Sequence, residues 1–340
     1  MKKVLFLTII ICYFILSCKK INVTEDNYDQ TNITIGWYDS ILNPSIQNCV
    51  TYASALEASL KEGNIEESEL KWQSVSIAWR GVEPFIIKDF RNSFLAFRVD
   101  TWPVDTSDIN ELLNSTKLID EDFVNRLPSD NVGIYAIEYL VFSKYLEKNE
   151  NYYQLLKMLG AMLRTDFLKA EALIEDSEVK FKTSTGYTLS STIGQVLNQA
   201  PQICEETLLY KIAIPIGYYE YIDLDDKQLE AWRSETSHTI IFHTLKNLKD
   251  VFYGVGDSEG LNDFLMSADK KDIVDTADEY FAEAEDLYNK LTTPLFGRLE
   301  DNKDVLTELR LSFKKIRSLL MISVAPTLGF TVTFSDSDGD

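Results

Sequence analysis

Apolar residues recur at three- and four-residue spacing along almost the whole chain from Pro44 onward, which is the periodicity of amphipathic α-helices. Glycines and prolines interrupt the pattern, and strand-like alternation is confined to the short run 330–334. The expected helices lie near 45–61, 66–90, 132–148, 151–175, 188–213, 227–253, 271–291 and 301–323. The sequence therefore predicts an all-α fold, most simply helical bundles joined by short connections.

The N-terminus has the pattern of a secretory signal peptide. A Lys-Lys pair precedes an apolar run, Val4 to Leu16, that is too short to span a bilayer. The Ile-Leu-Ser-Cys sequence ending at Cys18 is similar to a bacterial lipobox, so we expect cleavage before Cys18 and lipid attachment to it. The alternative is an ordinary signal peptide with a chance cysteine. The lipobox predicts a membrane-anchored lipoprotein of the cell envelope, facing the periplasm or exposed at the surface.

Composition divides the chain into five segments. They are a signal peptide (1–17), a polar tether (18–40), two helical halves (41–185 and 186–325) and an acidic tail (326–340). The triplet Ala-Trp-Arg at 78–80 recurs at 231–233, each time on an expected long helix, which is weak support for a duplicated bundle. Residues 92–114 mix aromatic and charged side chains and predict an irregular loop, either functional or covering the core.

Charge and cysteine content narrow the functional classes. The net charge of −21 should repel phosphate backbones, so we expect no nucleic-acid partner. Once Cys12 leaves with the signal peptide and Cys18 carries lipid, only Cys49 and Cys204 remain. One disulfide and two separate buried thiols are equally compatible with this count.

The segment Val132–Phe142 is apolar on nearly every side and carries a single charge, Glu138. A helix of this kind is buried, and a buried carboxylate requires compensation by a metal, an arginine or hydrogen-bond donors. Tyr135 lies three residues earlier on the same face, and oxygen ligands of this type suit hard cations. We therefore expect Glu138 and Tyr135 to contact a metal or ligand. The alternative is a purely architectural partner for Glu138, such as Arg80 or Arg98.

The sequence gives less support for other candidate metal or catalytic sites. His238 and His243 are separated by about 140° around a helix, so they cannot bind one metal together without help. Glu235 and His238 would share a helical face, as carboxylate and histidine ligands do in bundle metal sites. The sequence has no Gly-x-Ser-x-Gly elbow, and the acidic residues at 336–340 lack the later ligands of a calcium loop.

Four sequence blocks together resemble the imelysin-like family. They are the Ala-Trp-Arg-Gly-Val-Glu block at 78–83, the Trp-Pro segment at 100–105, Gly-Ile-Tyr-Ala-Ile-Glu at 133–138, and Trp-Arg-Ser at 232–234 with the chain's ending from Leu328. The resemblance implies that residues 41–340 form one imelysin-like domain of two helical-bundle halves. It also implies a pocket between the halves near the third block, an extracytoplasmic location, and a link to iron or other metal acquisition.

The third block departs from the family pattern Gly-x-His-x-x-Glu, because Tyr135 stands where the family has histidine. A phenol coordinates a metal well only when it is deprotonated, from a reference pKa near 10. The departure weighs against a hydrolytic zinc site, so we do not expect an enzyme.

The resemblance and the residues together predict a lipoprotein that binds a metal or small ligand in a cleft between helical halves. Glu83, Trp102 and Arg233 are further pocket residues that the matched blocks imply. The expected cofactor is iron or another divalent or trivalent metal, and iron-uptake components are possible partners. One alternative is an imelysin-type metallopeptidase, and another is a helical adaptor of a membrane complex that binds no small ligand.

Overall fold

The regular secondary structure between residues 28 and 333, the part of the chain that the computed structural model describes, consists entirely of helices. The all-α prediction is therefore confirmed, and residues 330–333 form no strand. The signal peptide, Cys18 and residues 334–340 lie outside the described range.

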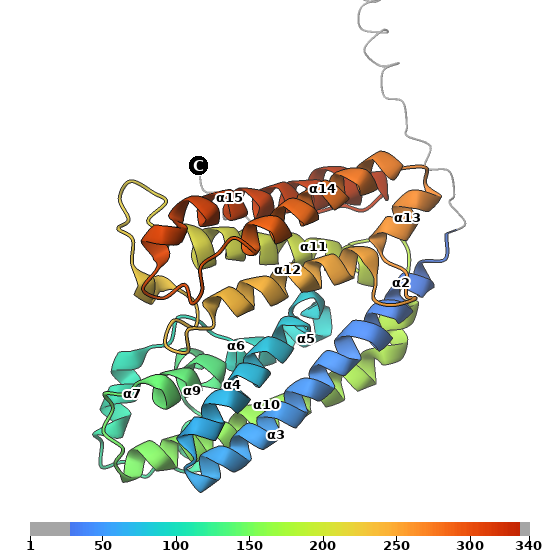
Figure 1. Ribbon diagram of the computed structural model, residues 1–340. Helices are drawn as coiled ribbons and strands as arrows, with labels where there is room; N and C mark the ends of the chain where they lie inside the picture. The colour runs from blue at the N-terminus through green and yellow to red at the C-terminus, as the bar shows by residue number, and fades with distance from the viewer. Residues whose placement is uncertain (1–27, 334–340) are drawn as a thin grey trace, which may run out of the picture.

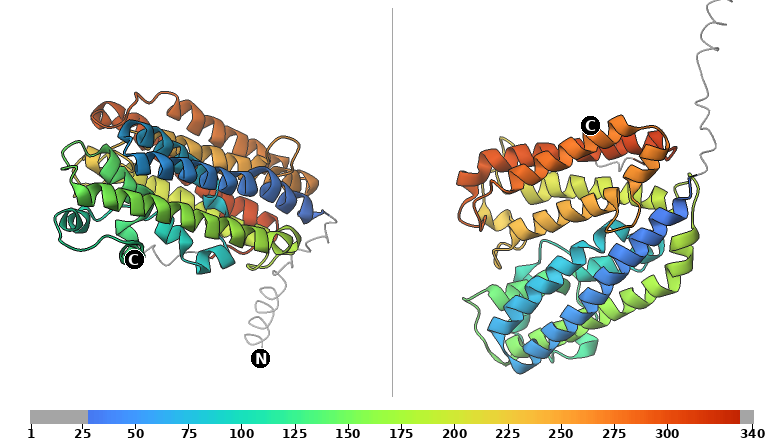
Figure 2. Two further views of the ribbon diagram at one scale, coloured as in Figure 1. Left: turned by 90° about the horizontal axis from the view of Figure 1, so that it is seen from below. Right: turned by 45° about the vertical axis from the view of Figure 1, so that its right-hand side comes forward.

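Figures 1 and 2 show two groups of helices stacked on one another. The first group contains α2 (Gln30–Trp37), α3 (Asn43–Glu62), α4 (Ile65–Arg80), α5 (Lys88–Asn92), α6 (Leu95–Val99), α7 (Thr106–Leu113), α8 (Glu121–Val124), α9 (Gly133–Phe142) and α10 (Glu150–Thr183). The second group contains α11 (Thr192–Glu206), α12 (Ser237–Tyr253), α13 (Leu261–Ser267), α14 (Lys271–Tyr288), α15 (Leu299–Ser318) and α16 (Ala325–Thr327). In the first group α3 packs along α4 and α10, and in the second α15 packs along α11 and α14.

Shorter elements join these helices and extend them. Three segments are π-helical, so that each backbone hydrogen bond spans five residues instead of four. They are η1 (Tyr38–Leu42), η4 (Thr207–Ala213) and η6 (Leu319–Val324). Three 3₁₀ turns are η2 (Glu83–Phe85), η3 (Ser129–Asn131) and η5 (Asp226–Gln228). The irregular loop expected at 92–114 contains α6 and α7, which are short helices joined by turns.

Side-chain caps explain several of the helix boundaries. Asn64, Asn149 and Ser191 each accept a hydrogen bond from the backbone N–H three residues later, at the starts of α4, α10 and α11. Gly63 ends α3 in the left-handed conformation, which glycine adopts without steric cost.

The predicted tether is wrong from residue 30 onward, because α2 belongs to the folded body. Ile33 and Trp37 are fully buried, and Trp37 Nε1 donates to the carbonyl oxygen of Val251 at 3.0 Å. These two apolar residues are four apart and so share one helical face, although the surrounding polar residues obscure the pattern.

Several expected helices are too long. The segment expected at 66–90 ends at Arg80, and the one expected at 132–148 ends at Phe142. The segment expected at 227–253 begins only at Ser237. The second Ala-Trp-Arg triplet therefore lies in a turn rather than on a helix, and the two triplets are not structurally equivalent.

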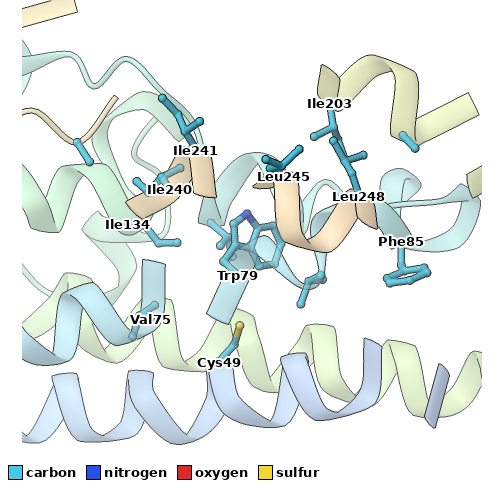
Figure 3. Close-up of a cluster of buried hydrophobic side chains, with 14 of the residues drawn as sticks. Cys49, Val75, Trp79, Phe85, Ile134, Ile203, Ile240, Ile241, Leu245 and Leu248 are labelled. Carbon is cyan, nitrogen blue, oxygen red and sulfur yellow. The ribbon is translucent and has the colours of Figure 1, made fainter. Parts of the chain in front are cut away.

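A continuous apolar core joins the two groups. Figure 3 shows side chains of α12 meeting residues of the first group, with Ile240, Ile241, Leu245 and Leu248 on one side and Val75, Trp79 and Ile134 on the other. Cys49 and Cys204 are both buried and unpaired, so the two thiols are separate. Among the described helices, none has both the length and the apolar character that crossing a membrane requires.

Candidate functional site

Glu138 lies in the middle of α9 with 1% of its surface exposed, as its apolar flanks predict. Its carboxylate accepts hydrogen bonds from the backbone N–H of Ser234 at 2.9 Å and from the Ser234 hydroxyl at 3.0 Å. Neither Arg80 nor Arg98 pairs with it: Arg80 binds other acids and Arg98 pairs with Asp166. The architectural alternative therefore named the wrong arginines: the two Ser234 donors compensate Glu138, together with the positive charge of Arg233. Burial is the main cause that raises the pKa of Glu138 to about 7.

Tyr135 is fully buried one turn earlier, and its hydroxyl donates to Glu230 Oε1. Tyr135 and Glu138 thus bind different residues, although both partners lie in the segment 230–234. Burial, followed by the negative charge of Glu230, raises the pKa of Tyr135 well above its ordinary value. A neutral phenol is a poor metal ligand, so the geometry does not favour the predicted Glu138–Tyr135 metal pair.

Gly133, the first residue of the Gly-x-Tyr-x-x-Glu block, has a steric role. Its φ is +78°, and a Cβ there would lie 2.5 Å from the carbonyl oxygens of Arg98 and Val99. Only glycine fits this close backbone approach, which sets the start of α9 and hence the positions of Tyr135 and Glu138.

Five charged side chains form a network of ion pairs that joins the two helical groups and reaches Tyr135 through Glu230; we call them the Arg80 cluster. Arg80 is fully buried, with Nη1 2.7 Å from Glu83 Oε1 and Nη2 2.8 Å from Asp100 Oδ1. Nη1 also lies 3.5 Å from Glu230 Oε1, and Lys211 Nζ lies 2.9 Å from Glu230 Oε2. Three carboxylates therefore share two cations.

The members of the Arg80 cluster differ in how well their charges are compensated. Burial raises the pKa of Glu83 to about 7, although Arg80 and Lys211 oppose this. Glu230 is more deeply buried, but there the positive charges of Lys211 and Arg80 outweigh desolvation and lower its pKa. Glu83 is thus the acid of the cluster that lacks full compensation.

Elements distant in sequence bring the cluster together. Arg80 is the last residue of α4, Glu83 the first of η2, and Asp100 the residue after α6. Lys211 projects from the π-helical η4, and Glu230 precedes the turn in which Ala231 adopts φ +53°. Sequence reasoning missed Lys211 and Glu230, although Lys211 stands alone in an apolar run, the same signal that identified Glu138.

A groove opens beside the Arg80 cluster, between the first group and α11, with a volume of about 350 Å³. We call it the seam groove; its lining includes Trp79, Glu83, Phe97, Asp100, Gln199 and Glu206. Trp79 Nε1 donates to Asp100 Oδ2 at 2.7 Å, which links the aromatic wall to the acidic one. The groove therefore combines carboxylates with aromatic surface.

Of the three predicted pocket residues, only Glu83 lines the seam groove. Trp102 is partly buried against the core, and its peptide bond to Pro103 is cis. Arg233 lies over the rings of Trp232 and Tyr139, with Cζ 4.4 and 4.9 Å from the ring centroids. The structure therefore does not bring the three residues to one pocket.

The remaining acid and histidine candidates do not form a ligand set. Glu235 has φ +58° and precedes α12, so it does not share a helical face with His238. Between residues 28 and 333, no group of three or more histidine, cysteine or acidic side chains is arranged to hold a metal ion.

The comparisons agree with this architecture. The family model for imelysin, peptidase M75, matches residues 37–317, so the chain belongs to the imelysin family. An imelysin-like protein from Psychrobacter arcticum 273-4 has a similar crystal structure, with a TM-score of 0.72 and 15% identity over 89% of this chain and 97% of the other. A proposed iron-regulated protein A precursor from Parabacteroides distasonis ATCC 8503 gives a TM-score of 0.68 and 15% identity over 88% and 94%. A search of curated proteins found no match.

Proposed function

We propose that this protein is a ligand-binding lipoprotein of the cell envelope, and that the seam groove takes up a small, positively charged, metal-bearing molecule. One observation carries the proposal: Glu83 and Asp100 line a groove between the two helical groups, with Glu206 beside them and the largely exposed ring of Phe97 on its wall. Carboxylates offer charge to a cation, and aromatic faces bind both apolar surface and cations.

The charge balance supports a cationic ligand. The Arg80 cluster contains three acids and two cations, and burial keeps the pKa of Glu83 at about 7. A cation in the groove would supply the compensation that Glu83 lacks and would displace its proton. The net charge of −21 also favours the approach of cations over anions.

The size of the groove favours a molecule over a bare ion. A water molecule occupies about 30 Å³ in the liquid, so a groove of about 350 Å³ admits a ligand of many atoms. The iron link comes from the similar structure described as an iron-regulated protein A precursor, and for this chain it is part of the proposal. The envelope location rests on the signal-peptide pattern and on Cys18.

Calorimetric titration with a cationic ferric trihydroxamate complex tests the proposal. We expect saturable binding that Glu83→Gln and Glu206→Gln each weaken about tenfold, which corresponds to about 1.4 kcal/mol. Glu66→Gln is the matched control, because Glu66 is an exposed acid on α4 away from the groove. At pH 7, binding should release about half a proton, since a group with a pKa near 7 is then half protonated.

Three results would count against the proposal. They are no binding of the complex, equal binding by the two groove variants and the wild type, and chelator-sensitive cleavage of a protein substrate. The last result would favour the metallopeptidase alternative.

A further inference from the structure

Arg233 is a cation without an acidic partner. Arg80, Arg98, Arg164 and Arg317 each pair with a carboxylate, whereas Arg233 forms no ion pair within residues 28–333. Its Nε is buried and has no hydrogen-bond acceptor. A buried donor without an acceptor is rare in folded proteins and calls for an explanation, such as a water molecule or a bound ion.

The surroundings hold the Arg233 side chain in one place. Its guanidinium lies over the rings of Trp232 and Tyr139. Trp232 stacks on Phe296 with ring centroids 5.2 Å apart, and the Tyr139 hydroxyl donates to Asn110 Oδ1 at 2.8 Å. Because packing fixes these rings, little rotamer freedom remains for a ligand to remove.

The Tyr145 hydroxyl lies beside both the Arg233 guanidinium and the Ser143 hydroxyl. Ser143, at the end of α9, is 5% exposed, and its Oγ is buried with no hydrogen-bond partner. Tyr145, two residues later, is 71% exposed and forms an edge-to-face pair with Tyr139. The place therefore combines a guanidinium held against two rings, a buried hydroxyl and a largely exposed phenol.

The pKa of Tyr145 indicates how the site affects a negatively charged oxygen. Desolvation opposes ionisation of its phenol, yet the hydroxyls of Tyr139 and Ser143 and the charge of Arg233 outweigh it and lower its pKa. An oxygen that carries negative charge is thus stabilised beside Arg233.

We propose that Arg233, Ser143 and Tyr145 form a binding site for an oxyanion, either a carboxylate or a phosphate, outside the seam groove. None of the three residues lines that groove. The planar arginine fork binds such groups through paired hydrogen bonds, and the two hydroxyls are suited to donate to a remaining oxygen. Tyr145 would move aside or donate when the anion enters.

A structural role for Arg233 is the competing explanation. The backbone of Arg233 lies next to Glu138, and its charge lowers the pKa of that carboxyl against the larger effect of burial. Arg233 would then serve only to hold the turn at 231–235 and to offset Glu138. The two explanations differ in whether an added anion changes the environment of Trp232.

The test is titration of the purified protein with sodium phosphate and, separately, sodium acetate, with sodium chloride at equal ionic strength as the reference. Tryptophan fluorescence is the readout, and Trp232→Phe assigns the signal. We expect a saturable change with at least one of the two anions. Arg233→Gln should abolish it, Arg233→Lys should weaken binding at least tenfold, and Tyr145→Phe should weaken it a few-fold.

Arg91→Gln is the matched control for the loss of one positive charge, because Arg91 is exposed and donates to Gln199 rather than stacking on a ring. It should leave the response unchanged. The proposal is overturned if neither anion produces more change than chloride, or if Arg233→Gln and Tyr145→Phe both respond like the wild type. Tyr145→Phe keeps the test valid if Arg233→Gln fails to fold, since Tyr145 lies largely in solvent.

Discussion

Glu138 and the Arg80 cluster are neighbouring buried sites that compensate charge in opposite ways. Glu138 accepts hydrogen bonds from Ser234 and has no ion-pair partner within the described residues, and its pKa rises to about 7. Glu230 has comparable burial but pairs with Lys211 and Arg80, and its pKa falls. Burial alone therefore does not decide whether an acid stays ionised at neutral pH; the charge of its partner does.

The largest expected effect comes from removing the central cation of the cluster. Arg80→Met would leave Glu83, Asp100 and Glu230 with only Lys211 as a cation. We expect a loss of about 3–5 kcal/mol in the free energy of unfolding at pH 7, since removing one member of a buried ion pair leaves the charge of its partners uncompensated. Urea denaturation measures this. A loss below about 1 kcal/mol would show that the cluster does not depend on Arg80.

The next largest effect is the contribution of Glu138 to the pH dependence of the unfolding free energy. Its folded-state pKa lies above the ordinary 4.5, so folding favours the protonated form. The stability it contributes is complete below about pH 4.5 and is lost as the pH rises to about 7. The shift from 4.5 to about 7 corresponds to at most about 3 kcal/mol.

Glu138→Gln removes this titration while keeping an oxygen acceptor for Ser234. The unfolding free energy of the variant, minus that of the wild type, should rise between pH 4.5 and 7, because only the wild type loses the contribution. Urea denaturation at several pH values gives both curves. Parallel curves would mean that Glu138 is as well compensated as Glu230.

A smaller effect distinguishes the hydroxyl groups of Tyr135 and Tyr139, which both lie on α9. Tyr135→Phe removes the hydroxyl that donates to Glu230 and keeps the ring in the core. A hydrogen bond to a charged group contributes about 1.5–3 kcal/mol, and we expect a loss in that range by thermal or urea denaturation. Tyr139→Phe, which loses the bond to the neutral Asn110 and the contact of its hydroxyl with Tyr145, is the control and should cost about 1 kcal/mol.

The smallest effect concerns the neutral donors of Glu138. Ser234→Ala removes the hydroxyl bond at 3.0 Å and keeps the backbone N–H bond at 2.9 Å. We expect a loss of about 1 kcal/mol and a further rise in the pKa of Glu138, seen as a shift of the pH profile to higher pH. An unchanged profile would show that the backbone bond alone compensates the carboxylate.

Much of this comparison could be anticipated from the sequence. The apolar run around Glu138 predicted its burial, and the family resemblance placed it at the junction of the two helical halves. Tyr135 was expected nearby, and it does lie one turn away. The helix boundaries were less predictable, because the turn at 231–235 depends on two residues with positive φ that no local pattern indicated.

The partners of the buried charges could not be anticipated. Arg80 was a candidate for Glu138, but it binds Glu83 three residues away and Asp100 twenty residues away. Lys211 and Glu230 were missed because their pairing across 19 residues, and the contact of Glu230 with Arg80 across 150 residues, arise only when the chain packs. The seam groove was missed in detail for the same reason, as its walls come from α4, η2, α6 and α11.

The sequence by itself determined the all-α class, the family and the burial of Glu138, because these depend on periodicity and composition within short segments. Only the tertiary structure decided that Ser234 and the charge of Arg233, rather than Arg80 or Arg98, compensate Glu138, and that Tyr135 donates to Glu230. Hydrogen bonds and ion pairs fall off within a few ångströms, so a partner 95 or 96 residues away is chosen by how the two helical groups pack.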